Sequence, residues 1–458
     1  NVACILMNRL LKTSLLWCLS QWVLVTTSGA DWPRFLGPEG NATSLETGLL
    51  PTWPENGPPL AWKKTVGTGY SAPSVIGDQL VLHHRLGKQE VMEAFTASTG
   101  SPLWKHAYPS HYIDPYGYNN GPRCTPLLTE DRCYGYGAEG KLFCLNRQSG
   151  QLIWERDTAK DFEVPEAFFG VGSTPLLEGD KLIVMVGAQP NAGVVAFDAQ
   201  SGKTLWTAVG KGTWDGEPRT GWRGEPLVQW RGHEKQASYA SPVAATIHGK
   251  RHLLCLMRQG LVSLDPETGK ERFHYWFRAT VNESVNAMNP VVSGDTILIS
   301  AAYYRVGAVL LQVAADGSSV APLWRSLALE IHWTTPVLFE GHLYAFSGRN
   351  EPDARFRCVE MVTGKVQWDQ DESWRKSYQG PPEKYGRGSA ILADGKLIVM
   401  GEAGQLGLFQ PSPEGPREIS RFQVPGMKYP CWTAPVLSDG RLFLRSEDQL
   451  LSYQLRKP

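Results

Sequence analysis

The 458-residue chain lacks the features that mark several classes of protein. Its charge has no excess of either sign, because 45 Lys and Arg residues balance 45 Asp and Glu residues. Proteins that neutralise nucleic-acid phosphates carry a basic surface, so no nucleic-acid partner is expected. No long stretch follows the 3.6-residue period of an amphipathic helix, which argues against a helical fold.

Motifs that would identify an enzyme are also absent. The chain contains no phosphate-binding Gly-x-x-x-x-Gly-Lys-Ser/Thr, no Gly-x-Ser-x-Gly nucleophile elbow and no His-Glu-x-x-His zinc motif. His248 and His252 flank a predicted turn and do not share one face of a helix, so they are not expected to chelate a metal. We therefore predict neither catalytic nor metal-binding residues.

Cysteine is sparse and shows no disulfide spacing. Two of the 8 cysteines lie in the first 30 residues. The others are Cys124, Cys133, Cys144, Cys255, Cys358 and Cys431. An exported chain can oxidise such residues, but buried free thiols are the expectation here.

The first 30 residues have the pattern of an export signal. Met7–Lys12 is basic, Leu15–Val25 is mostly apolar, and Ser28–Ala30 supplies small residues at a cleavage site. The apolar run is short for a transmembrane helix. We expect cleavage after Ala30, a periplasmic or secreted protein, and no membrane span after cleavage. An uncleaved anchor is the alternative.

The chain does contain one short pattern repeated eight times. Each copy has an anchor, Pro in all but one, then an aliphatic run and a turn; most copies end in Ser/Thr-Gly and Trp. The anchors are Pro73, Pro126, Pro175, Pro242, Pro290, Pro336, Ala390 and Pro435. Their average spacing is about 52 residues, and self-similarity at such a period indicates stacked structural units.

Each repeat predicts four short antiparallel strands, because apolar or alternating runs such as Lys181–Val186 stand between turns. Four-stranded sheets repeated radially form β-propellers, so the predicted fold is all-β, an eight-bladed β-propeller. The last copy ends without its fourth strand, which Leu60–Lys64 is expected to supply. We therefore divide the chain into a signal peptide (1–30), an N-terminal extension (31–59) and the propeller (60–458).

The repeated Trp residues are interpreted as packing wedges between blades. They occupy one position of the repeat, at Trp62, Trp104, Trp154, Trp206, Trp324 and Trp368. Phe273 and Phe422 take the same position in two copies. An exchange of Trp for Phe suits burial of a large aromatic surface better than contact with a ligand.

The ending Ser/Thr-Gly-x-x-x-Trp, as in Thr99–Trp104 and Ser201–Trp206, resembles the tryptophan-docking repeat of quinoprotein propellers. These proteins have pyrroloquinoline-quinone (PQQ) type repeats, and the resemblance covers residues 60–456. The family includes eight-bladed PQQ alcohol dehydrogenases and cofactor-free relatives such as the outer-membrane assembly protein BamB. The dehydrogenases resemble one another in an adjacent cysteine pair, and some carry a Cys-x-x-Cys-His haem motif. This chain has neither.

The resemblance therefore implies an exported, non-catalytic propeller of the BamB-like type. It implies a scaffold without a cofactor that binds a protein or glycan partner through its axial face and long loops. The alternative that the resemblance leaves open is a periplasmic PQQ- and calcium-dependent dehydrogenase of alcohols or sugars.

A candidate binding site follows from the repeat alignment. The strand at each anchor is expected to be innermost, so the residue three before each anchor should lie at the axial mouth. The large side chains at these positions are Tyr70, Arg123, Tyr239, Trp333, Arg387 and Trp432, and they are the predicted binding residues. The two smaller residues are Gly172 and Ala287. Arg and aromatic side chains favour planar or anionic ligands. Alternatively, the aromatics plug the channel and the Arg residues pair with carboxylates.

Two long insertions, 106–122 and 207–238, precede anchors and are expected around the same mouth. The second contains an echo, Trp-Asp-Gly-Glu-Pro at 214–218 and Trp-Arg-Gly-Glu-Pro at 222–226. Long loops in a compact fold are often functional, and Trp, Tyr and Arg suit a recognition surface. A packed lid is the alternative.

Overall fold

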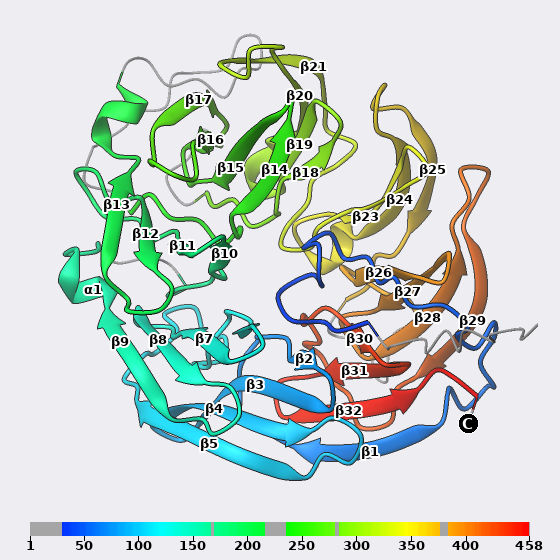
Figure 1. Ribbon diagram of the computed structural model, residues 1–458. Coiled ribbons are helices and arrows are strands. Elements are labelled where there is room, and N and C mark those ends of the chain that lie inside the picture. Colours follow the sequence, from blue (N-terminus) through cyan, green and yellow to red (C-terminus); the bar gives the residue numbers. More distant parts are fainter. Residues whose placement is uncertain (1–29, 166–168, 216–234, 280–283, 376–382, 458) are drawn as a thin grey trace, which may run out of the picture.

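Eight four-stranded antiparallel sheets surround a central axis in the computed structural model (Figure 1). The structure describes residues 30–165, 169–215, 235–279, 284–375 and 383–457. In seven blades the four strands are consecutive in the chain. The predicted eight-bladed β-propeller is confirmed.

The first four blades along the chain contain the following strands: β2 (Ser74–Ile76), β3 (Gln79–Leu86), β4 (Gln89–Thr96) and β5 (Pro102–Pro109); β6 (Leu127–Leu128), β7 (Arg132–Tyr136), β8 (Lys141–Asn146) and β9 (Leu152–Asp157); β10 (Leu176–Glu178), β11 (Lys181–Val184), β12 (Val194–Asp198) and β13 (Thr204–Ala208); β14 (Val243–Ile247), β15 (Lys250–Leu256), β16 (Gly260–Leu264) and β17 (Glu271–Trp276).

The other four blades contain the remaining strands: β18 (Val291–Ser293), β19 (Thr296–Ala301), β20 (Gly307–Val313) and β21 (Val320–Ser326); β22 (Val337–Phe339), β23 (His342–Ser347), β24 (Arg355–Glu360) and β25 (Val366–Asp371); β26 (Ser389–Ala393), β27 (Lys396–Met400), β28 (Gln405–Gln410) and β29 (Arg417–Gln423); β30 (Val436–Ser438), β31 (Arg441–Arg445), β32 (Gln449–Gln454) and β1 (Leu60–Thr65).

Burial explains why the strands of one blade differ in composition. The central strands lie between neighbouring blades and read as continuous apolar runs, as in β16, where all five residues are buried. The outermost strands face solvent on one side, and β1 alternates between exposed and half-buried residues. Tight turns with a positive φ join the first two strands, as at Gly77 (56°) and Asp394 (48°).

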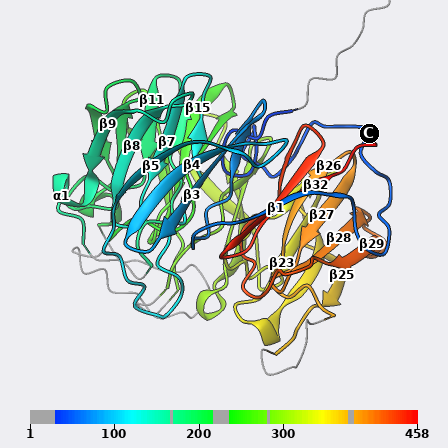
Figure 2. The same ribbon diagram turned by 90° about the horizontal axis from the view of Figure 1, so that it is seen from below.

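The ring is closed by pairing between the two ends of the propeller. Strand β1 is antiparallel to β32, with Lys63 opposite Leu451, and it completes the sheet β1-β32-β31-β30. Figure 2 shows the ring edge-on with β1 beside β32. The predicted shared blade is confirmed, and this closure leaves no gap between the first and last sheets.

The repeated Trp residues pack one blade onto the next. The Trp154 indole N–H donates to the Ala199 carbonyl at 3.1 Å in the following blade. Its ring lies against Gly202, where an added Cβ would be 2.6 Å from Trp154 Cε3. The same donation to the next blade is made by Trp62, Trp104, Trp206, Trp324 and Trp368. The interpretation of these residues as packing wedges is confirmed.

The N-terminal extension joins the first and the seventh blade, which are separated by the blade that closes the ring. Trp32 exchanges two backbone hydrogen bonds with Val75 in β2. Further along, Ser44 donates its backbone N–H to the carbonyl of Leu392 in β26. In Figure 1 the segment (dark blue) crosses the central region of the ring. Residues 31–46 therefore form a strap across one end of the axial channel.

Helices are few and short: α1 (Thr158–Asp161), η1 (Lys211–Trp214), η2 (Tyr303–Arg305) and η3 (Glu351–Asp353). In the described part of the chain, none is long and apolar enough to cross a membrane. The six described cysteines are free and buried, as expected, and burial raises the pKa of their thiols.

Candidate functional site

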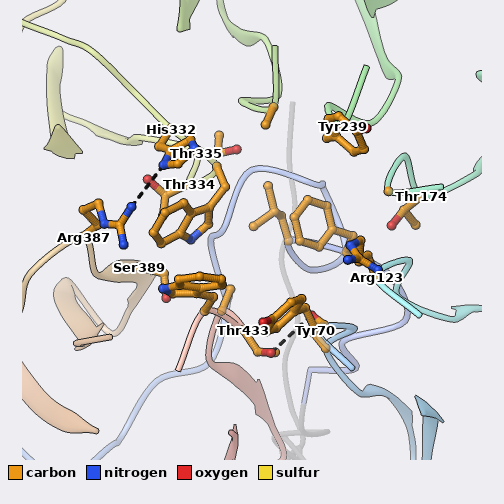
Figure 3. A pocket seen from close by; sticks show the side chains of 18 of the residues that line it. Tyr70, Arg123, Thr174, Tyr239, His332, Thr334, Thr335, Arg387, Ser389 and Thr433 are labelled. Carbon is orange, nitrogen blue, oxygen red and sulfur yellow. Dashed lines mark hydrogen bonds between the residues drawn. The ribbon is translucent and has the colours of Figure 1, made fainter. Parts of the chain in front are cut away.

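A cavity of about 230 Å³ lies on the propeller axis. All eight residues that precede the anchors by three line it: Tyr70, Arg123, Gly172, Tyr239, Ala287, Trp333, Arg387 and Trp432. The innermost strands begin one residue after the anchor in seven blades, and β26 begins one residue before it, so residues at equal offsets from the anchors converge on the same cavity. Figure 3 shows His332 and Arg387 across the cavity from Arg123 and Tyr239. Sequence reasoning thus assembled this wall; the role of these residues in binding stays a prediction.

Aromatic rings form a continuous series around the wall. Their centroid distances are Tyr239–Phe169 5.4 Å, Phe169–Tyr118 5.9 Å, Tyr118–Trp432 5.5 Å, Trp432–Trp333 5.1 Å, Trp333–His332 4.8 Å and His332–Tyr303 5.2 Å. Tyr70 joins the series at 5.3 Å from Trp432. Offset and edge contacts of this kind hold the rings in fixed positions. The wall therefore presents a preformed aromatic surface.

Arg387 is held by two carboxylates behind the wall. Its Nη2 lies 2.9 Å from Glu351 Oε1 and 2.9 Å from Glu402 Oε2, and the Glu402 side chain is fully buried. Glu402 also accepts hydrogen bonds from the indoles of Trp374 (2.9 Å) and Trp432 (3.0 Å). The guanidinium stacks over Trp333 at 4.6 Å. We call this group the Glu402 cluster. It fixes the rings of Trp333 and Trp432, which line the cavity.

Arg123 has an equivalent partner in the first insertion. Its Nη2 lies 2.6 Å from Asp114 Oδ2, and the Asp114 side chain is buried. The same carboxylate accepts the hydroxyl of Tyr112 (3.1 Å) and the backbone N–H of Tyr116 (2.9 Å). Asp114 therefore ties the insertion to the cavity wall. Both Arg residues pair with carboxylates, which is the alternative that the sequence left open.

Burial shifts the titration of groups in the wall. It lowers the pKa of His332 to about 3, and the positive charge of Arg387 acts in the same direction. Burial raises the pKa of Tyr303 to about 12. The His332 imidazole is therefore neutral at pH 7, and the Tyr303 hydroxyl is protonated.

The strap supplies a part of the cavity that the sequence did not predict. Phe35 and Leu36 both line the cavity, at the level where the strap crosses the channel. The sequence delimited residues 31–59 as an extension without placing it; Trp32 is buried against β2, and Leu36 is buried in the same core. The aromatic and aliphatic run Trp32–Leu36 was the available signal. Its pairing with β2 is a tertiary contact that no repeat encodes.

Exposed aromatics surround the open end of the cavity. We use the term rim for Tyr116, Tyr118 and Tyr304, which are 55%, 44% and 43% exposed. Tyr116 contacts Phe169 at 5.1 Å and Tyr304 contacts Tyr303 at 6.3 Å, and both partners line the cavity. The first insertion thus lies at the mouth, although its first four residues (106–109) belong to β5.

Where it is described, the second insertion fits the packed lid that was the alternative to a recognition surface. Trp214 is only 3% exposed. Its indole donates to Gln236 Oε1 at 2.8 Å, and its ring packs against Trp276 at 5.6 Å. Trp214 therefore belongs to a packed layer over its blade. The second half of the echo, 222–226, lies outside the described residues.

The cavity does not fit a PQQ–calcium pair. Its volume of about 230 Å³ is below the roughly 300–1,000 Å³ of typical small-molecule pockets. The quinone carries carboxylate groups, but Arg123 and Arg387 already pair with protein carboxylates. Within the described ranges, no three His, Cys, Asp or Glu side chains converge in a way that could hold a metal ion.

The fold and the docked Trp residues define the class of the protein: an eight-bladed β-propeller with a Trp docked between neighbouring blades. Residues 87–370 match the family described as outer membrane protein assembly factor BamB. Because this match spans more than half of the sequence, the chain belongs to that family.

Individual relatives agree with this assignment. Outer membrane protein assembly factor BamB of Burkholderia pseudomallei (strain K96243) is 29% identical over 194 residues, 41% of this chain and 47% of that protein. The chain thus matches about half the length of this relative.

Among solved structures, BamB from Moraxella catarrhalis has a TM-score of 0.54 at 16% identity, with 87% of this chain and 98% of that chain covered. Quinohemoprotein alcohol dehydrogenase from Comamonas testosteroni has a TM-score of 0.62 at 13% identity, with 93% and 81% covered. At these identities the structural likeness shows the shared fold alone.

Proposed function

We propose that this protein is a non-catalytic periplasmic scaffold that binds a segment of a partner protein at its axial mouth. The observation that carries the proposal is the preformed aromatic cavity, closed at one end by the strap and surrounded by the exposed rim at the other. Exposed aromatic patches next to a pocket are typical of protein interaction sites. The family match supports a role in the assembly of outer membrane proteins.

The cavity suits one large uncharged side chain of the partner. A cavity of about 230 Å³ lined by aromatic side chains has room for an aromatic or a branched aliphatic group. An anionic group would gain little, because both guanidinium groups in the wall already have carboxylate partners. This size and charge favour an apolar anchor of a peptide over a glycan or an anionic cofactor.

Binding of synthetic peptides tests the proposal. Fluorescence anisotropy would compare labelled peptides that differ only at a central Trp, Leu, Ser or Glu. We expect the Trp and Leu peptides to bind, and Trp432→Ala or Tyr118→Ala to weaken them at least tenfold, about 1.4 kcal/mol. Leu205→Ala is the matched control, because Leu205 is 47% exposed on the outer strand β13.

Two outcomes would contradict the proposal. One is equal affinity for all four peptides. The other is retention of added PQQ and Ca²⁺ through gel filtration together with dye reduction on alcohols, which would support the dehydrogenase alternative.

A further inference from the structure

A second cavity, of about 490 Å³, lies next to the axial mouth. It is lined by Tyr304, Arg305, Glu330, Arg349, Arg355 and Arg357, among others, and we call it the arginine pocket. The loop between β19 and β20 supplies Tyr304 and Arg305, and the loop between β23 and β24 supplies Arg349. Neither the family match nor the axial cavity explains why four Arg side chains line one pocket.

Two of the four Arg residues pair with a carboxylate of their own blade. Arg355 Nε lies 2.8 Å and Arg357 Nε 3.0 Å from Asp369 Oδ1. Arg357 also donates to the Ser347 hydroxyl at 3.3 Å and to the Ala328 carbonyl. These contacts hold β24 against β25, so Arg355 and Arg357 form a fixed wall.

The other two have no carboxylate partner in the described part of the chain. Neither Arg305 nor Arg349 lies within 4.0 Å of a described Asp or Glu oxygen. Arg349 is positioned by aromatic rings, because its guanidinium carbon is 4.6 Å from the centroids of both Tyr303 and Tyr304. A guanidinium stacked in this way keeps its N–H donors available at its edge.

The backbone also directs Tyr304 and Arg305 outwards. Tyr304 (φ 51°) and Arg305 (φ 62°) are consecutive non-glycine residues in the left-handed region, and both are exposed. This conformation costs energy for each residue, and such strain is concentrated at functional sites. The loop therefore holds side by side an aromatic ring and a guanidinium that forms no ion pair within 4.0 Å in the described part of the chain.

Glu330 and Asp353 line the same pocket, but neither forms an ion pair within 4.0 Å with Arg305 or Arg349. Burial raises the pKa of Glu330, which shows that its charged form is poorly solvated. Arg305 and Arg349 keep their charge at any physiological pH. A ligand that donates acceptor oxygens to these two residues gains charge-assisted hydrogen bonds that the protein itself does not supply.

We propose that the arginine pocket binds the carboxylate of an acidic peptide segment, with the adjoining peptide against Tyr304. Arg349 connects this pocket to the axial mouth, because its carbonyl accepts a hydrogen bond from Arg387 Nη1 at 2.6 Å. The inference goes beyond the proposed function and does not depend on it. One partner segment could use both sites, with an apolar anchor in the cavity and an acidic residue nearby.

Binding of labelled six-residue peptides of Glu, Gln or Lys to the full chain tests the pocket at low ionic strength. We expect the Glu peptide to bind at least tenfold more tightly than the Gln peptide. Arg305→Gln should weaken the Glu peptide about tenfold, because Arg305 is exposed and its charge-assisted hydrogen bond to the peptide is lost. Arg305→Lys should restore part of the affinity. Arg417→Gln, which changes an exposed Arg of β29, is the control.

Equal affinity for the Glu and Gln peptides would overturn the proposal. So would an Arg305→Gln protein that binds the Glu peptide like the parent, or a preference for the Lys peptide, which would assign the pocket to Glu330 and Asp353. Failure of the axial site is measured separately, with the apolar-anchor peptides and Trp432→Ala.

Discussion

Removal of the Glu402 side chain tests whether Arg387 is a fixed part of the wall or a group free to bind a ligand. Glu402 is fully buried and accepts hydrogen bonds from two indoles, from the Arg387 backbone N–H at 3.0 Å and from its guanidinium at 2.9 Å. Removal of one member of a buried charge pair costs about 3–5 kcal/mol, because the remaining charge loses its partner. We therefore expect Glu402→Ala to lower the free energy of unfolding by about this amount.

Two further variants calibrate the magnitude. Glu402→Gln keeps the side-chain volume and one acceptor oxygen, and Arg387 retains Glu351, so its cost should be smaller. Glu414→Ala removes an exposed ion pair with Arg417, where the expected cost is below about 1 kcal/mol.

Urea unfolding at pH 7, followed by circular dichroism and by tryptophan fluorescence, measures these differences. Coincident transitions in the two signals justify a single free energy. If Glu402→Ala and Glu414→Ala proved equally stable, the Glu402 cluster would not hold the wall, and Arg387 would be available to an anionic ligand.

Three other predictions follow from packing and titration. Gly202→Ala should destabilise the protein more than Gly249→Ala in urea unfolding, because both have positive φ but only Gly202 lies against Trp154. Between pH 6.5 and about 3, the His332 imidazole binds a proton in the unfolded chain but not in the folded protein, so His332 lowers the free energy of unfolding as the pH falls. His332→Gln should therefore lose less stability than the wild-type protein over this pH range in an acid titration. Trp32→Ala should cost about 3–5 kcal/mol, measured by urea unfolding, because the side chain is 1% exposed where the strap pairs with β2. An acid titration unchanged by His332→Gln, or a Trp32→Ala protein of wild-type stability, would contradict the respective prediction.

The fold was predictable because its determinants are local and repeated. In four copies the docked Trp follows a turn Gly by four residues, as Trp154 follows Gly150, and the turn glycine leaves the space that the preceding Trp fills, as Gly202 does for Trp154. The pre-anchor residues were predictable for the same reason, since eight equal offsets in eight equal blades converge on the axis.

The groups that complete the site break the repeat and could not be predicted in this way. Glu402 lies in the turn between β27 and β28, where the equivalent residue is Glu447 in the last blade but Ala138 in the second, and Asp114 lies in an insertion. The strap reaches the axis through backbone pairing with β2 and β26, which depends on tertiary structure. Trp is a residue type common in recognition surfaces, but Trp214 is buried against Trp276, and this burial depends on tertiary structure.

Site-specific photo-crosslinking tests the central claim, binding at the axial mouth, most directly. A benzophenone amino acid would replace Tyr118 at the rim or, as control, Leu205 on the outer strand β13. Each protein would be irradiated with an unfolded outer membrane protein chain. The account predicts an adduct from position 118 and none from position 205. An adduct from 205 alone, or equal adducts from both, would contradict it.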